Sequence, residues 1–501
     1  MVSKFTDFLI RLLVVFPLVL SIWLILINMI SIHQGFLLLP VNLLVAICAA
    51  ILIPKSFISK VLGYFKSNPK AVLTLLIGVA VVSVGLRFGF LAHEYQPTSD
   101  PEHFYTAAKD LAETGFLDKS YVPYVANYPY LYSYDFLLGK AMSIFGQGTL
   151  AVIVLNTLLD LLAAGLLYLL IRAITRNKNA ALIGVLLWLL SPFNIIFSAI
   201  SLPIIAVNTL IIAALLLVYL LLKNLNNLKL LVPLSIATGA VFSLTNAFRP
   251  FMVVFLIALV IYWLLYFLKN PKFKTMLNLD VALIGVLLPF FMLNYAYAQM
   301  VSVQTDLPPT LNSGGWSIYV GSNYEYAGRW NQEDSTYGTQ VFIEEPTSAE
   351  AHSRLQKEGM QRYAALSTGE LVDFGLKKTV SLGGDLYNMT YNMDTYPSLW
   401  DNLSFKWFVW IISALYVYTL LLLTAKFFID EVRKKQVELN FMHYLFLVFF
   451  GLFIALLFVE VLNRYFTPFL VFMTIFASIA LINWLPNLNK RVESAPESLT
   501  S

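Results

Sequence analysis

Long uninterrupted apolar stretches constrain this chain more than any other feature of its sequence. A helix needs about 20 apolar residues to cross a bilayer, and twelve stretches of the 501-residue chain approach that length. Each one predicts a membrane-spanning helix, because a helix satisfies its own backbone hydrogen bonds in lipid. The first stretch is too long for a cleaved signal peptide and lacks a small-residue cleavage site. The predicted spans are residues 10–32, 37–54, 71–92, 148–171, 180–198, 203–222, 230–247, 251–268, 279–297, 407–425, 441–459 and 465–484.

The composition supports an all-α polytopic membrane protein. Hydrophobic residues make up 59% of the chain and charged residues 12%, against roughly 25% charge in a soluble domain. These values exclude a soluble protein, a disordered protein and a nucleic-acid binder that uses a basic patch. The single cysteine, Cys48, excludes an intrachain disulfide and a multi-cysteine metal site. A large external region without cysteines favours a bacterial envelope.

The charges are distributed unevenly about the predicted spans. With the N-terminus inside, most of the 33 basic residues fall in short inner connections, and most of the 29 acidic residues fall outside. This positive-inside pattern predicts a bacterial plasma membrane protein with both termini in the cytoplasm. The predicted organisation is spans at 1–92, an extracytoplasmic segment at 93–147, spans at 148–297, a second extracytoplasmic segment at 298–405, spans at 406–485 and a cytoplasmic tail at 486–501.

The two extracytoplasmic segments are too long for simple turns, and we expect short amphipathic helices at 102–113, 134–145 and 369–378. Since the inner connections leave no room for a domain, any chemistry should take place on the outer face. No Gly-Lys-Ser/Thr phosphate loop occurs in the chain, and no ATP is expected there.

Two acids, Asp100 and Glu102, follow the third predicted span directly and flank Pro101. One interpretation is a helix start, with Asp100 as the N-cap, Pro101 at the first helical position and Glu102 in the first turn. The other is a catalytic base at the membrane rim, where partial desolvation raises the proton affinity of a carboxylate. Such a base would deprotonate an acceptor hydroxyl.

Aromatic and amide residues in both extracytoplasmic segments are candidate sugar or acceptor ligands. The stretch 127–135 predicts either an interfacial aromatic belt or a wall on which a sugar ring stacks, with an acid that accepts sugar hydroxyls. In the second segment, glycines with aromatics and amides predict either ordinary turns or loops that lie over a hydroxyl-rich ligand. The candidates are Tyr105, Tyr128, Tyr130, Asp135, Asn323 and Trp330.

Three arginines near the outer ends of predicted spans are candidate ligands for a lipid-linked phosphate, because a guanidinium offers a planar array of donors. A lysine of the amphipathic stretch 369–378 is a fourth candidate. Arg464 has an alternative partner in Glu460, one helical turn earlier, and Arg87 can extend to the headgroups instead. Lys378 can meet bulk headgroups as readily as a bound phosphate. The four candidates are Arg249, Arg464, Arg87 and Lys378.

The order of these motifs resembles the GT-C superfamily of polyprenyl-phosphate-sugar-dependent glycosyltransferases. The likeness is strongest to the branch with protein O-mannosyltransferases, the aminoarabinose transferase of lipid A and Gram-positive envelope glycosyltransferases. The matching elements are Ser99-Asp100, Tyr128-Pro129, Ser191-Pro192, Arg249-Pro250, Gly321-Ser322-Asn323 and Arg464-Tyr465. Unlike many relatives, this chain separates its two acids by Pro101 and has no acid after Leu202-Pro203.

The resemblance implies a GT-C-like fold and an inverting, single-displacement transfer from an undecaprenyl-phosphate-type sugar, with Asp100 as the base. It implies no certain cofactor; no metal ligands are assigned, and a divalent cation stays open. The acceptor would be an envelope glycan, such as a teichoic acid or a polysaccharide, a glycolipid or a protein.

Two other functions compete with this one. A lipid-linked oligosaccharide polymerase or ligase also has many spans and a large outer loop, but would depend on outer-loop arginines and histidines. A transporter or flippase would need polar residues along a path through several spans, where this chain offers Asn156, Asp160 and Asn208. Substitution of Asp100 by Asn separates the three, since only the glycosyltransferase depends on that carboxylate.

Overall fold

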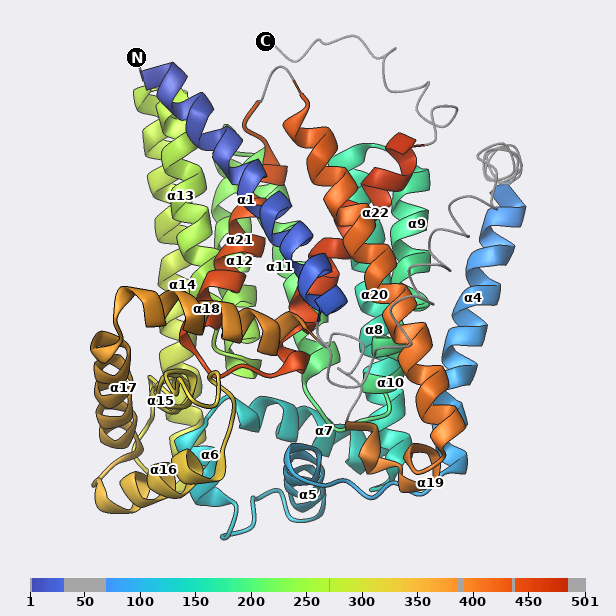
Figure 1. Ribbon diagram of the computed structural model, residues 1–501, viewed down its shortest axis with the longest axis vertical. Coiled ribbons are helices and arrows are strands. Elements are labelled where there is room, and N and C mark those ends of the chain that lie inside the picture. Colours follow the sequence, from blue (N-terminus) through green and yellow to red (C-terminus); the bar gives the residue numbers. More distant parts are fainter. Residues whose placement is uncertain (1, 31–68, 270, 385–391, 435–437, 485–501) are drawn as a thin grey trace.

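The computed structural model describes residues 2–30, 69–269, 271–384, 392–434 and 438–484. Every regular element in these residues is a helix (Figure 1), which confirms the all-α fold class. The predicted span at 37–54 and the predicted tail at 486–501 lie outside the described residues.

Within the described ranges, nine helices are long and apolar enough to cross a membrane. Two shorter apolar helices, α9 (Lys178–Leu189) and α13 (Val253–Lys269), stand among them. Eleven of the twelve predicted spans therefore coincide with helices, while a count of twelve is not established. The nine long helices are α1 (Val2–Ile30), α4 (Pro69–Gly89, continued by η1, Phe90–Ala92), α8 (Thr149–Thr175), α11 (Ile204–Lys223), α12 (Leu228–Phe248), α14 (Phe273–Thr305), α20 (Leu403–Val432), α21 (Phe441–Phe458) and α22 (Thr467–Trp484, preceded by η3, Asn463–Phe466).

The predicted span at 180–198 is not one helix. The helix α9 ends at Leu189, and a separate short helix, α10 (Pro192–Phe197), follows. Pro192 cannot continue the first helix because it lacks a backbone N–H. The Ser191 Oγ accepts a hydrogen bond from the Asn194 N–H at 3.4 Å and so caps the second helix.

The spans differ widely in how far they are covered by other helices. The central helix α22 has 83% of its most apolar window buried, whereas α4 has 17% and lies at the edge of the bundle (Figure 1). Asp160 of α8 holds α4 in place, because its carboxylate forms an ion pair with Arg87 and accepts a hydrogen bond from the Trp188 Nε1 at 2.8 Å.

One end of the bundle carries a set of short helices that we call the cap (Figure 1). The helix α14 has 33 residues, or about 50 Å at 1.5 Å per residue, and it reaches from the bundle to the cap. The helices near 102–113, 134–145 and 369–378 were expected from the sequence, whereas α6, α16 and α17 were not. The cap consists of α5 (Asp100–Glu113), α6 (Val122–Asn127), α7 (Leu131–Phe145), α15 (Gly315–Gly321), α16 (Gln332–Glu344), α17 (Ser348–Ala365), α18 (Thr368–Gly383) and α19 (Pro397–Trp400).

Candidate active site

A cavity of about 1120 Å³ lies between the cap and the bundle. Its cap side is formed by α5, by α6 with the turn that follows it, and by residues of α15 and α16. Its bundle side is formed by the connection between α12 and α13 and by the connection between α21 and α22. Apolar side chains of α13 and α21, such as Val254, Leu452 and Leu456, continue the lining into the bundle.

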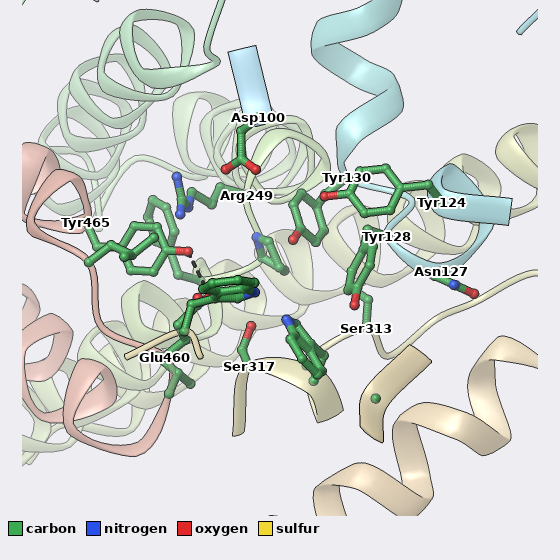
Figure 2. Close-up of a pocket in the computed structure, with 18 of the residues that line it drawn as sticks. Asp100, Tyr124, Asn127, Tyr128, Tyr130, Arg249, Ser313, Ser317, Glu460 and Tyr465 are labelled. Atoms are coloured by element: carbon green, nitrogen blue, oxygen red, sulfur yellow. Dashed lines mark hydrogen bonds between the residues drawn. The ribbon is translucent and has the colours of Figure 1, made fainter. Parts of the chain in front are cut away.

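Asp100 stands at the start of α5 and lines this cavity (Figure 2). It is the first helical residue, and the N-cap position falls to Ser99, whose side chain makes no capping bond. The interpretation of Asp100 as a capping residue is therefore wrong. Ser99 has a φ of 56°, a left-handed conformation that costs a non-glycine residue energy and is common at functional sites. The Asp100 carboxylate forms an ion pair with the guanidinium of Arg464.

Arg464 and Glu460 both line the cavity from the connection between α21 and α22. Arg464 pairs with Asp100, 364 residues away in the chain, and Glu460 accepts a hydrogen bond at 3.1 Å from the Tyr465 hydroxyl. Glu460 is 8% exposed, and burial raises the pKa of its carboxyl group. The Arg249 Cζ lies 4.2 Å from the centre of the Tyr465 ring, an arrangement that cation–π attraction favours. Arg249 and Arg464 thus line the same cavity as Asp100, and Figure 2 shows Arg249 beside Asp100.

Three tyrosines, Tyr124, Tyr128 and Tyr130, form one wall of the cavity (Figure 2). The ring centroids of Tyr124 and Tyr128 are 5.2 Å apart, and those of Tyr128 and Tyr130 are 6.2 Å apart. Burial raises the pKa of each phenol, to about 12 for Tyr130. The phenols are therefore neutral at physiological pH. Trp330, which is 50% exposed, lines the same cavity from the cap.

Three other candidates lie elsewhere. Glu102 is exposed on the first turn of α5, away from the cavity lining. The Tyr105 hydroxyl donates a hydrogen bond to the Gln147 carbonyl oxygen at 2.6 Å. Asp135 was expected to accept sugar hydroxyls, but it is fully buried outside the cavity, and neither carboxylate oxygen has a partner among the described residues. Burial raises the pKa of Asp135 well above its ordinary value.

Two of the four candidate phosphate ligands, Arg87 and Lys378, do not line the cavity. Arg87 is fully buried and paired with Asp160, so it neither reaches the headgroups nor faces the site. Lys378 is 1% exposed, and its ammonium donates to the carbonyl oxygens of Gly321 at 2.6 Å and Val459 at 2.8 Å and to the Tyr363 hydroxyl at 3.0 Å. With three donors and three acceptors, Lys378 fastens the cap to the bundle and has no donor left for phosphate.

The glycine-rich motif of the second segment contributes to the same attachment. A Cβ atom on Gly321 would lie 2.2 Å from the Val459 carbonyl carbon, so only glycine allows this close approach of α15 to the bundle. Asn323 donates a hydrogen bond to the Asp334 carboxylate at 2.8 Å and does not line the cavity. Gly321 and Asn323 therefore build the cap and do not line the cavity.

Several lining residues were not identified as candidates from the sequence. Trp316 and Ser317 lie in the glycine-rich stretch that was expected to form loops, but that stretch forms the helix α15. Glu460 was considered only as an ion-pair partner of Arg464, whereas it lines the cavity and accepts a hydrogen bond from Tyr465. Among the residues that the structure describes, no group of three or more His, Cys, Asp or Glu side chains could hold a metal ion.

Residues 132–297 match the family described as dolichyl-phosphate-mannose-protein mannosyltransferase. No curated protein sequence matches the chain. Among solved structures, the oligosaccharyltransferase of Archaeoglobus fulgidus tethered to an acceptor peptide with the NVT sequon matches with 14% identity and a TM-score of 0.48, over 84% of this chain and 50% of that chain. The complex of that enzyme, AglB, with an inhibitory peptide and a dolichol-phosphate has 14% identity and a TM-score of 0.46, over 87% and 53%.

ArnT from Cupriavidus metallidurans, bound to undecaprenyl phosphate, matches with 12% identity and a TM-score of 0.38, over 81% of this chain and 77% of that chain. The chain spans about half the length of the oligosaccharyltransferase structures that it matches.

The structure is a helical membrane fold, and its segment 132–297 is similar to a glycosyltransferase family. This match agrees with the resemblance expected from the sequence motifs. More particularly, the matched segment runs from α7 to α14.

Proposed function

We propose that this protein transfers a sugar from a polyprenyl-phosphate donor of the undecaprenyl type to an extracytoplasmic acceptor of the bacterial cell envelope. The observation that carries the proposal is the composition of one cavity. It combines a carboxylate that is 37% exposed, Asp100, with two arginines, a wall of tyrosines and an apolar extension into the bundle.

The apolar extension and the arginines suit the two parts of such a donor. A polyprenyl tail is stable only in an apolar environment, and the lining residues of α13 and α21 provide one. The phosphate would then lie where the chain places Arg249 and Arg464. A guanidinium has five N–H donors, so Arg464 can hold Asp100 and still donate to a phosphate oxygen. The Glu460–Tyr465 hydrogen bond holds the ring on which Arg249 stacks.

The reaction proposed for this cavity is a single displacement. A carboxylate oxygen of Asp100 takes the proton from an acceptor hydroxyl, and the hydroxyl oxygen forms a bond to the anomeric carbon. The bond between that carbon and the phosphate oxygen breaks, and the electron pair leaves with the polyprenyl phosphate. Arg249 and Arg464 stabilise the negative charge of the departing phosphate. The attack comes from the face opposite the phosphate and inverts the anomeric configuration.

The two acids of the Asp100-Pro101-Glu102 motif supply a matched test. Asp100 lines the cavity, while Glu102 points to solvent from the same helical turn. We expect cells that carry only the Asp100→Asn variant to lose one sugar from an envelope glycan, glycolipid or protein, as detected by mass spectrometry. Cells with Glu102→Gln should keep that sugar.

Both variants must be present in the membrane in equal amounts for this comparison. Loss of the sugar in the Glu102→Gln cells and its retention in the Asp100→Asn cells would contradict the assignment of the base. If the envelope of cells without the protein has lost no sugar at all, the proposed reaction itself is wrong.

A further inference from the structure

The hydroxyl groups of the tyrosine wall are available for a ligand. No hydrogen bond joins the Tyr124, Tyr128 or Tyr130 hydroxyl to another residue in the described part of the chain. The Tyr128 and Tyr130 hydroxyls point into the cavity (Figure 2). A neutral phenol both donates and accepts hydrogen bonds. Three such groups in a row suit a ligand with several hydroxyls better than they suit an anion.

One wall of the cavity is formed by described residues between 307 and 348, and none of its lining residues is a cation. They are serines, threonines, glycines, prolines and apolar or aromatic side chains, together with one charged residue, Glu345. Glu345 shares Arg354 with two further acids, Glu344 and Glu358, so this group is negative overall. A polymer with phosphate or carboxylate groups would be repelled by it.

Arg249 and Arg464 come from the α12–α13 and α21–α22 connections, next to the apolar part of the lining. With Asp100 they also line a small second pocket, to which Tyr124 and Tyr130 belong. The charge of the cavity is thus concentrated in this group, where the donor phosphate would lie. The wall formed by residues between 307 and 348 is the part of the cavity that suits an uncharged acceptor.

The same wall holds an aromatic ring in a fixed position. A Cβ atom on Gly338 of α16 would lie 2.2 Å from the Trp316 ring, so this glycine lets the indole lie directly against the helix backbone. Trp316 and Trp330 line the same cavity as the three tyrosines. Fixed aromatic faces with adjacent hydroxyls such as that of Ser317 can pack on the C–H face of a sugar ring while its hydroxyls are hydrogen-bonded.

We propose that Tyr124, Tyr128, Tyr130, Trp316 and Trp330 form an acceptor subsite for an uncharged sugar residue. This inference rests on the proposed function and narrows it, since the acceptor is then a neutral glycan and neither an anionic teichoic-acid type polymer nor a peptide.

Binding of defined probes to the purified full chain in lipid nanodiscs tests this inference. The neutral probes are tetrasaccharides of glucose, mannose, galactose and N-acetylglucosamine, and the competing probes are a glycerol phosphate oligomer and a serine-containing hexapeptide. We expect at least one neutral tetrasaccharide to bind, as measured by saturation-transfer NMR. Tyr128→Phe removes only a hydroxyl and should weaken that binding about fivefold, as expected for one hydrogen bond.

Tyr326→Phe is the matched control, because Tyr326 is an exposed cap tyrosine outside the cavity lining. It should leave tetrasaccharide binding unchanged, and Trp330→Ala should weaken it. The inference is overturned if no neutral tetrasaccharide binds, if Tyr128→Phe and Trp330→Ala bind as the parent does, or if the glycerol phosphate oligomer or the hexapeptide binds more tightly than every neutral probe.

A parallel measurement with undecaprenyl phosphate keeps this inference distinct from the proposed function. Binding of that lipid should weaken in Arg249→Gln and persist in Tyr128→Phe. If only the binding of neutral sugars fails, the proposed class of acceptor is wrong and the proposed donor stands. If the parent protein does not bind undecaprenyl phosphate, the proposed donor is wrong, whether or not a tetrasaccharide binds.

Discussion

Two arginine–aspartate pairs in this protein have the same chemistry and opposite surroundings. Arg87 and Asp160 join α4 to α8, both side chains are fully buried, and the Trp188 indole closes the pair on one side. Arg464 and Asp100 join the end of the bundle to the cap, and the Asp100 side chain is 37% exposed to the cavity. A buried pair serves packing, since removal of one partner leaves an uncompensated charge. In a pair that lines a cavity, either side chain can leave its partner and bind a ligand instead.

The comparison shows why an arginine near a membrane surface is an ambiguous sign of function. Both arginines lie near the same end of the bundle, and both were candidate ligands for phosphate. Only Arg464 faces space that a ligand can enter. The two pairs differ in their burial by neighbouring helices. Four substitutions of buried or cavity-lining charged residues test the consequences of this difference.

The largest effect is expected from Asp100→Asn. Loss of a general base costs about 10²- to 10⁴-fold in rate, and we expect sugar transfer to fall by that factor. The thermal unfolding temperature of the variant should change little, because a partly exposed ion pair contributes about 1 kcal/mol or less. A rate assay and a melting curve on the same preparation measure the two effects. If Asp100→Asn unfolds at a lower temperature and keeps its activity per folded molecule, the Asp100–Arg464 pair serves stability and not catalysis.

The opposite result is expected from Asp160→Asn. The Arg87 guanidinium would remain buried without its counter-charge, and the protein should lose about 3–5 kcal/mol of stability. Sugar transfer per folded molecule should stay the same. The double variant Arg87→Met with Asp160→Leu should regain much of the stability, because it leaves no charge unpaired. If the double variant is less stable than Asp160→Asn alone, the pair does more than neutralise a buried charge.

A smaller effect is expected from Arg464→Gln. A charge-assisted hydrogen bond contributes about 1.5–3 kcal/mol, so binding of undecaprenyl phosphate should weaken about 10- to 100-fold. Arg87→Gln should not weaken donor binding in the fraction that stays folded. Equal losses in the two variants would mean that the guanidinium at the cavity has no direct role in binding the lipid phosphate.

The smallest effect concerns Asp135, an acid buried without an arginine. Its folded-state pKa is raised by burial, so the protonated form favours folding and stability is lost as the pH rises above the ordinary value of 3.8. Asp135→Asn keeps the shape without the charge and should stabilise the protein by about 1 kcal/mol at neutral pH. The gain should shrink toward pH 4, and melting curves across this range measure it. A gain that is constant with pH would show that ionisation of Asp135 does not cause the instability.

The sequence alone was enough to place most of the helices. The apolar stretches predicted the nine long helices and the two shorter apolar helices that the structure describes. The acid–proline motif predicted a helix that starts at Pro101, and the structure starts it at Asp100. These features are local, because hydrophobic length and helix-start chemistry depend on residues within a few turns. Tyr128 and Tyr130 were likewise identified from a short motif, and both line the cavity.

Only the tertiary structure decided which charged residues meet. Asp100 pairs with Arg464 across 364 residues, and neither hydropathy nor local spacing contains that contact. The sequence offered both Asp100 and Glu102 as catalytic candidates, whereas the turn of α5 directs Asp100 to the cavity and Glu102 to solvent. It also treated Arg87 and Lys378 as cations near a surface, although the packing of α8 and α18 buries both. Burial and partnership depend on how separate helices pack, and the pattern within one helix does not fix that packing.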